Sequence, residues 1–177
     1  GDFKIHTFTG PGTFCVSCAG NAGGSNTIEY LVVAGGGGTG TGGGGAGGFR
    51  FASPSLAPLS YPAKPLAAPA ALPVTATGYP VTVGAGGTAA SPLGGANGVS
   101  GSNSVFSGSS TITSSGGGGS GRGGQNGLTG GSGGGAGYDN NKSCTAAGNT
   151  PPVSPPQGNA GGSAPSTCHQ AGGAGGG

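Results

Sequence analysis

The sequence contains no methionine and no tryptophan, and it carries only five basic and three acidic residues in 177. Three carboxylates and two histidines are too few for most active sites, so we expect no enzymatic activity and no cofactor. The few basic residues are spread along the chain and provide no electrostatic surface for nucleic acid. The longest apolar run, YLVVA at residues 30–34, is far too short to span a membrane, so we expect no membrane insertion.

Glycine and proline are abundant instead, at 49 and 14 residues. This composition alone is typical of low complexity, but the apolar residues gather in short alternating runs that predict strands. The chain begins GDFKIH and ends within a glycine run, so we expect it to be a piece of a longer protein. No helix is favoured anywhere. The predicted strands lie at residues 2–10, 12–18 and 26–34, and within 72–77, 79–83, 103–107 and 110–115.

Two of these strands allow a prediction about which faces are covered. In the first, Phe3, Ile5 and Thr7 share one face, and His6 lies on the opposite, solvent-facing side rather than serving as a ligand. The strand at 26–34 is apolar on both faces, which predicts a central strand.

The stretch that follows this strand has the G-x-G-x-x-G spacing of a dinucleotide-binding turn, at Gly35, Gly37 and Gly40. That motif needs a helix whose N-terminus holds the phosphates. Further glycines and then recurring prolines follow here, and they exclude such a helix. We therefore reject the dinucleotide site.

Glycine-rich blocks at 35–48, 84–101, 116–137 and 158–177 separate the strands. Within 116–137 every third residue from Gly118 to Ala136 is small, which is the period of an extended polyproline II-type helix. Such helices have no internal hydrogen bonds, and glycine lets several pack side by side and bond laterally. We predict ordered, packed blocks, against the alternative of flexible linkers.

The ordered motifs FTGPGTF, EYLVVAGGGG, GGGGAGGFR, YPVTVGAGG, GSNSVFS, GGSGGGAGY and PPVSPPQGNAGG resemble the glycine-rich domain of tailed-phage fibre proteins, especially those of cyanophages. The resemblance implies a packed polyglycine II sandwich whose connecting loops contact the host surface. The expected fold is all-β, with short antiparallel β-sandwich strands and a polyglycine II bundle. We assign residues 1–34 to N-terminal strands and 35–177 to a glycine-rich region with interleaved strands.

The chain departs from that pattern in a proline-rich insertion at residues 53–73, which favours an extended, projecting loop. Binding needs exposed, varied side chains on a rigid support, and glycine segments supply only the support. Tyrosine beside amides and a carboxylate suits sugar binding through stacking and hydrogen bonds. The candidate binding residues are Leu56, Leu59, Tyr61, Lys64 and Leu66 in the insertion, and Tyr138, Asp139, Asn140 and Asn141 in a second loop.

Four cysteines leave disulfides, free thiols or a metal site open. Cys15 and Cys18 resemble half a zinc knuckle, but no second C-x-x-C exists, so we predict no metal site. We predict a disulfide between Cys144 and Cys168, which would close a loop of low apolar content.

Two functions follow. The first is a virion or extracellular adhesin domain that binds a host glycan or envelope protein. The second is a structural subunit of a filament whose loops contact other subunits and bind no receptor. Ice binding by a flat glycine face is a distant third.

Overall fold

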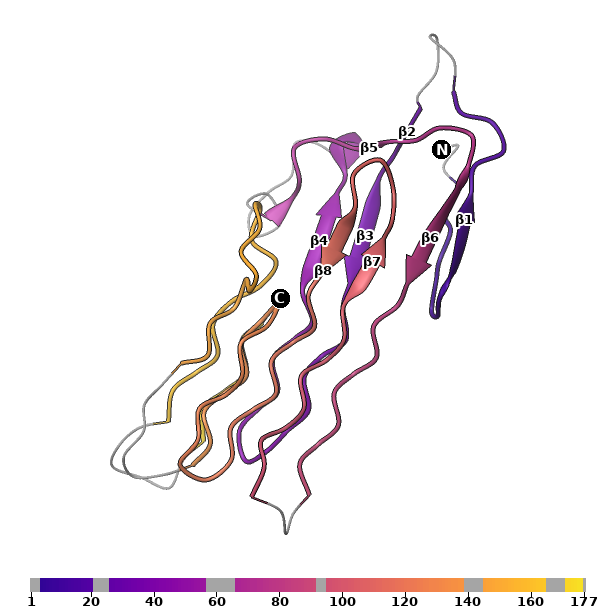
Figure 1. Cartoon of the computed structure of the whole chain (residues 1–177). Coiled ribbons are helices and arrows are strands. Elements are labelled where there is room, and N and C mark those ends of the chain that lie inside the picture. Colours follow the sequence, from indigo (N-terminus) through magenta and orange to yellow (C-terminus); the bar gives the residue numbers. More distant parts are fainter. Residues whose placement is uncertain are drawn as a thin grey trace.

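The protein is elongated, with its strands at one end and extended glycine-rich segments running side by side to the other end (Figure 1). We call these the strand end and the glycine end. The computed structural model describes residues 4–20, 26–56, 66–91, 95–138, 145–164 and 171–176. Its elements are β1 (Gly12–Cys15), β2 (Thr27–Ile28), β3 (Tyr30–Val33), β4 (Phe49–Ala52), the 3₁₀ turn η1 (Pro54–Leu56), β5 (Leu72–Pro73), β6 (Gly78–Thr82), β7 (Ser104–Phe106) and β8 (Ile112–Ser114).

All strand pairs are antiparallel, and no α-helix occurs in the described part of the chain, which confirms the all-β prediction. One sheet has the order β1-β6-β7-β8, and two further pairs are β2-β5 and β3-β4. The β7-β8 hairpin turns through the predicted Gly-Ser-Ser sequence, with Val105 opposite Thr113. β3, β4, β6, β7 and β8 each adjoin a glycine-rich segment that runs toward the glycine end, so the sheets and the bundle form one hydrogen-bonded unit (Figure 1).

The apolar core lies at the strand end, where β3 and β4 pack against β7 and β8. Tyr79 and Phe106 stack at its centre with ring centroids 5.5 Å apart, and Tyr79 is 5% exposed. The Tyr79 hydroxyl accepts a hydrogen bond from the Thr75 amide, so its polar atom is satisfied within the core. The buried core residues are Leu72, Val74, Tyr79, Phe106 and Ile112, with Phe14, Val16, Ile28, Tyr30, Val32 and Val81 packed around them.

The glycine segments are held together by lateral backbone hydrogen bonds. Within one segment, backbone amides three residues apart donate to carbonyls of the same neighbouring segment. The amides one position further along donate to a different neighbouring segment. Segment 115–121 is buried throughout and shows this arrangement on two sides. The bonds are Gly117 N to Gly35 O at 2.9 Å, Ser120 N to Gly38 O at 3.0 Å, Gly118 N to Ser132 O at 2.9 Å and Gly121 N to Gly135 O at 2.8 Å. These blocks are therefore packed, as predicted, and are not free linkers.

The single register predicted through residues 116–137 is wrong, because the chain reverses twice within the block. It bends at 122–125, where Gly124 has φ 72°, and again at 130–132. Gly127 is nevertheless confined, since a Cβ there would lie 2.0 Å from the Gly134 carbonyl oxygen. A threefold pattern in sequence cannot reveal such reversals, because glycine is compatible with both the extended segments and the turns.

Two strand predictions also need correction. Residues 4–10 form no strand, and Ile5 is 86% exposed rather than turned inward. His6 is exposed as predicted, although its ring meets Phe14 edge-on at 5.0 Å. β3 is not central: among the described residues it pairs with β4 alone, and Leu31 on its outer face is 61% exposed. Its apolar outer face is uncovered in the described chain.

Candidate functional site

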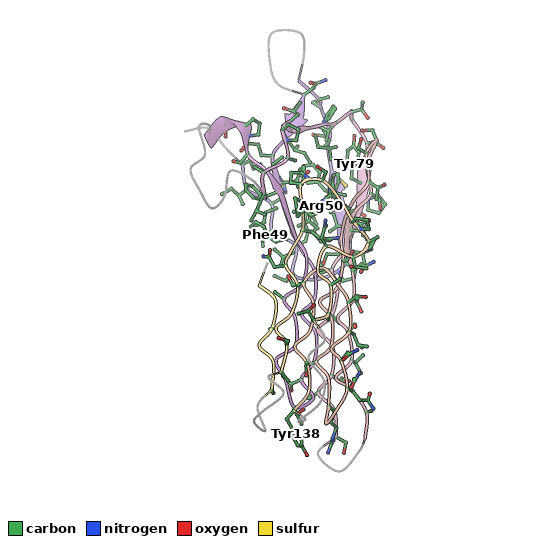
Figure 2. All side chains as sticks on the ribbon, turned by 90° about the vertical axis from the view of Figure 1, so that its left-hand side faces the viewer. Phe49, Arg50, Tyr79 and Tyr138 are labelled. Carbon is green, nitrogen blue, oxygen red and sulfur yellow. The ribbon has the colours of Figure 1, made fainter. Side chains whose placement is uncertain are left out.

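Tyr138 lies at the glycine end, far from the aromatic core at the strand end (Figure 2). It ends the buried glycine segment 132–137, and its side chain is 45% exposed. Its backbone is fixed on two sides: the amide donates to the Thr41 hydroxyl at 3.2 Å, and the carbonyl accepts from the Gly124 amide at 2.9 Å. A large aromatic side chain is thus presented from a firmly held backbone position.

The turn at residues 122–125 lies against this tyrosine. Its Gln125 amide donates to the Arg122 carbonyl at 2.7 Å, which closes the turn. A Cβ on Gly123 would lie 3.7 Å from the Tyr138 ring, so the ring and the turn are in van der Waals range. The side chain of Gln125 is exposed beside them.

Ser91 and Asn97 are also tied to this turn by hydrogen bonds. The Asn97 side chain accepts from the Arg122 amide at 3.1 Å and donates to the Asn126 carbonyl at 3.2 Å. The Arg122 guanidinium donates to the Ser91 carbonyl. Segments far apart in the sequence therefore meet at one end and hold one another in place. We call Thr41, Asn97, Arg122, Gln125, Asn126 and Tyr138 the tip.

The tip combines a half-exposed aromatic ring with exposed amide groups. A sugar can place an apolar ring face on tyrosine while amides exchange hydrogen bonds with its hydroxyls. The sequence predicted Tyr138 as a candidate binding residue but gave no prediction for Asn97, Gln125 and Asn126, which the structure places at the same end. The one sequence feature that could have pointed to this group is the polar pair Gln125-Asn126 inside a glycine-rich block. Asp139, Asn140 and Asn141, predicted beside Tyr138, lie outside the described residues.

The proline-rich candidate begins at the strand end. Leu56 closes η1, and half-buried Leu66 precedes Ala67, which forms a parallel bridge with Phe51 of β4. Leu59, Tyr61 and Lys64 lie outside the described residues. The described flanks of this candidate belong to the strand end, whereas Tyr138 lies at the glycine end (Figures 1 and 2).

Glu29, between β2 and β3, anchors η1. Its carboxylate accepts hydrogen bonds from the Ser55 amide at 2.6 Å and from the Ser53 hydroxyl at 2.9 Å. Hydrogen bonds from the side chain and backbone of Ser55, and from the side chain of Ser53, lower the pKa of Glu29 below its ordinary value. The start of the proline-rich segment is therefore held to the β2-β3 junction.

Cys15 and Cys18 are exposed free thiols near the strand end. The predicted partners Cys144 and Cys168 lie outside the described residues. Within the described ranges, no group of three or more histidine, cysteine or acidic side chains is placed to bind a metal ion. In the same ranges, no helix has the length and apolar character needed to cross a membrane.

The fold and the tip define a class of all-β protein in which short strands carry a bundle of extended glycine segments. Residues 9–177 match the family described as a glycine-rich domain, and the chain belongs to that family. Comparison with curated proteins found no match, and comparison with solved structures found none either.

Proposed function

We propose that this protein is an adhesin domain of a phage-type tail fibre, located on a virion or outside the cell, that binds a host cell-surface glycan or envelope protein through its tip. The observation that carries the proposal is the half-exposed ring of Tyr138, fixed by its backbone against the turn at 122–125. The resemblance to phage fibre domains supports the same assignment.

The bundle suits this role because it is stiff and nearly without side chains. Segments 115–121 and 130–137 are buried, and their amides bond to several different neighbours. Binding groups on a rigid support lose little conformational entropy when a ligand is bound. We further propose that the segments are polyglycine II helices, and the threefold spacing of their lateral hydrogen bonds supports this conformation.

A glycan fits the chemistry of the tip better than a charged or purely apolar ligand. The exposed amides of Gln125 and Asn126 offer both donors and acceptors near an aromatic ring. The proposal requires no cofactor and no catalytic group, because recognition by stacking and hydrogen bonding is sufficient.

The first prediction tests the ring. Tyr138→Ala should reduce adsorption of the labelled domain to cyanobacterial cells, the hosts that the resemblance implies, by about tenfold or more, because truncating an aromatic side chain that anchors a binding site typically costs about 2 kcal/mol or more. Tyr138→Phe, the matched control, should retain most of the binding. The midpoint of thermal unfolding should be nearly unchanged in both variants, and full adsorption by Tyr138→Ala would contradict the proposal.

A second variant separates the two ends of the molecule. Residues 57–65 are replaced by a Gly-Ser linker, with η1 and Leu66 retained. Adsorption should persist in this variant if the tip binds the receptor. Lost adsorption with intact folding would instead assign binding to the proline-rich insertion.

The alternative function is a structural subunit of a filament. The uncovered apolar face of β3 and β4 favours it, because such faces are typical of subunit contacts. Negative-stain imaging of the parent particle distinguishes the two functions: a single domain at the end of a fibre agrees with an adhesin, and regular repetition along a filament agrees with a structural subunit.

A further inference from the structure

One amide in every three along residues 116–122 donates its hydrogen bond to a side chain. The other amides of this stretch donate to backbone carbonyls of segments 34–40 and 132–137. The side-chain bonds are Gly116 N to Asn103 Oδ1 at 2.9 Å, Gly119 N to Ser100 Oγ at 3.3 Å and Arg122 N to Asn97 Oδ1 at 3.1 Å. We call Asn97, Ser100 and Asn103 the side-chain ladder.

The ladder is regular along its whole length. Its members lie three residues apart on segment 95–103, and the amides that they bind lie three apart on residues 116–122, which run in the opposite direction. This spacing matches an extended helix with three residues per turn, in which every third side chain points the same way. Segment 95–103 leads into β7 and residues 116–122 follow β8, and these strands pair Ser104 with Ser114. The ladder therefore continues the pairing of the β7-β8 hairpin along the bundle.

Segment 115–121 lacks a backbone acceptor in one direction. A chain with three residues per turn points its amides in three directions, and two of these directions reach other segments here. Its carbonyls accept hydrogen bonds from amides of neighbouring segments, including residues 42–48, 95–103 and 127–131. For the amides of Gly116 and Gly119, in the third direction, no described residue supplies a backbone carbonyl. The ladder oxygens take that place.

Gly116 and Gly119 are buried, so their amides need a partner within the protein. An amide left unpaired in a buried position is costly, and the ladder oxygens remove that cost. The ladder side chains themselves lie at the surface: Asn103 is exposed, and Ser100 and Asn97 are partly exposed. They therefore form the boundary between the bundle and solvent, at a position where a further glycine segment would otherwise be required.

Asn97, the last member of the ladder, also holds the turn at the tip. Its Oδ1 accepts from the Arg122 amide, and its Nδ2 donates to the Asn126 carbonyl at 3.2 Å, so one side chain binds both ends of the turn at 122–125. A Cβ on Gly123, within that turn, would lie 3.7 Å from the Tyr138 ring. The placement of the turn beside the ring therefore depends on Asn97.

We propose that the side-chain ladder replaces a missing glycine segment on this side of the bundle, and that Asn97 is a positioning residue for the binding tip. The first part concerns the bundle alone. The second part rests on the proposed function, because it gives the turn at 122–125 a role in presenting Tyr138. Asn97 acts through the turn and does not need to touch the ligand.

Native-state hydrogen exchange tests the ladder one amide at a time. Asn103→Ala should accelerate exchange of the Gly116 amide about tenfold relative to the Gly117 amide of the same variant, since only Gly116 loses its acceptor. Asn103→Asp keeps an accepting oxygen and should restore most of the protection. Ser102→Ala changes an exposed neighbour outside the ladder and should leave the ratio unchanged. Equal acceleration of both amides in Asn103→Ala, or acceleration of neither, overturns the ladder.

The positioning role of Asn97 is tested by nuclear Overhauser contacts between Gly123 and the Tyr138 ring, which can be measured without a receptor. Asn97→Ala should lose these contacts, and its adsorption to cells should fall. Ser100→Ala, which changes a ladder member away from the turn, should keep both. Retained contacts in Asn97→Ala overturn the positioning role, whatever the adsorption. Lost contacts with full adsorption would instead contradict the proposed binding site.

Discussion

At the scale of single residues, the glycines of the bundle are required because backbone atoms of neighbouring segments occupy the space of a side chain. A Cβ on Gly117, Gly118 or Gly119 would lie 2.1, 1.8 or 1.9 Å from a carbonyl oxygen, each on a different segment. Three consecutive residues thus face three different neighbours. At these three positions a side chain cannot be added without displacing a backbone carbonyl of a neighbouring segment.

Gly119→Ala should therefore destabilise the protein by about 3 kcal/mol or more, because the added methyl must push a backbone carbonyl aside. Gly86→Ala is the matched control: its Cβ would lie 3.7 Å from the nearest atom, the Gly36 carbonyl oxygen. That variant should be neutral or more stable by up to about 1 kcal/mol, through lower entropy of the unfolded chain. Denaturant unfolding measures both, and equal effects would contradict the packing.

Glu29 predicts a local dependence on pH. Its hydrogen bonds to Ser55 and Ser53 hold its pKa below the ordinary value of 4.5. Because the folded-state pKa is lowered, the anchoring of η1 is fully present above the unfolded-state pKa and is lost as pH falls through the folded-state pKa. Faster exchange of the Ser55 amide, relative to the intrinsic rate, should therefore appear only below about pH 4.5.

Glu29→Gln removes the titrating group and should remove this pH dependence, with the Ser55 amide less protected at neutral pH. A pH dependence identical to that of the wild type in the variant would assign the effect to another group.

At the scale of elements, the segment 149–157 joins the bundle to the sheets through one buried side chain. Gln157 is 1% exposed, and its side-chain oxygen Oε1 accepts a hydrogen bond from the Ser115 amide at 2.8 Å. Its amide nitrogen donates to the Ser115 hydroxyl at 3.2 Å and to the Pro151 carbonyl at 3.1 Å. The Gln157 side chain thereby links Ser115, which follows β8, to Pro151. The backbone carbonyl of Gln157 accepts a hydrogen bond from the Phe49 amide at the start of β4.

Gln157→Met keeps nearly the same volume but leaves the Ser115 amide and the Pro151 carbonyl without partners. We expect a loss of about 2–4 kcal/mol in unfolding free energy, since unsatisfied buried groups cost about 1–3 kcal/mol each. Gln125→Met makes the same change at an exposed turn and should alter stability by less than about 0.5 kcal/mol. Urea unfolding compares the two, and similar losses would show that burial is not the cause.

At the scale of the whole molecule, the lateral hydrogen bonds make the bundle cooperative with the sheets. Ordering polyglycine costs more backbone entropy than ordering any other sequence, so a single segment cannot stay extended alone. Here segment 115–121 continues β8, and segments 34–40 and 42–48 connect β3 to β4. The apolar core at the strand end therefore starts the alignment of the segments that follow.

The amides of Gly118 and Ser120, which are buried and bonded to other segments, should exchange with solvent only on global unfolding. Native-state hydrogen exchange in increasing denaturant measures this. The exposed Asn126 amide provides the internal comparison and should exchange much faster. Exchange of Gly118 and Ser120 at coil rates would exclude a cooperative bundle.

The sequence by itself determined the all-β class, most strand positions and the packing of the glycine blocks. Alternation with period two locates β1, β3, β6, β7 and β8, because side chains alternate between faces in any strand. Abundant glycine without helix signals predicts extended segments that bond laterally. It also predicts Tyr138 as a candidate binding residue, from its polar neighbours in a chain with few aromatic side chains.

Only the tertiary structure decided which segments are neighbours and where the chain reverses. Glycine has no side chain to encode a partner, so the contacts of Gly117, Gly118 and Gly119 with three different segments cannot be read from their identity. For the same reason, the sequence did not predict that the chain reverses at 122–125. It therefore also did not predict that Asn97, Gln125 and Tyr138 lie together at one end. The outer face of β3 is a tertiary result too, since periodicity shows that both faces are apolar but not which one lacks a partner.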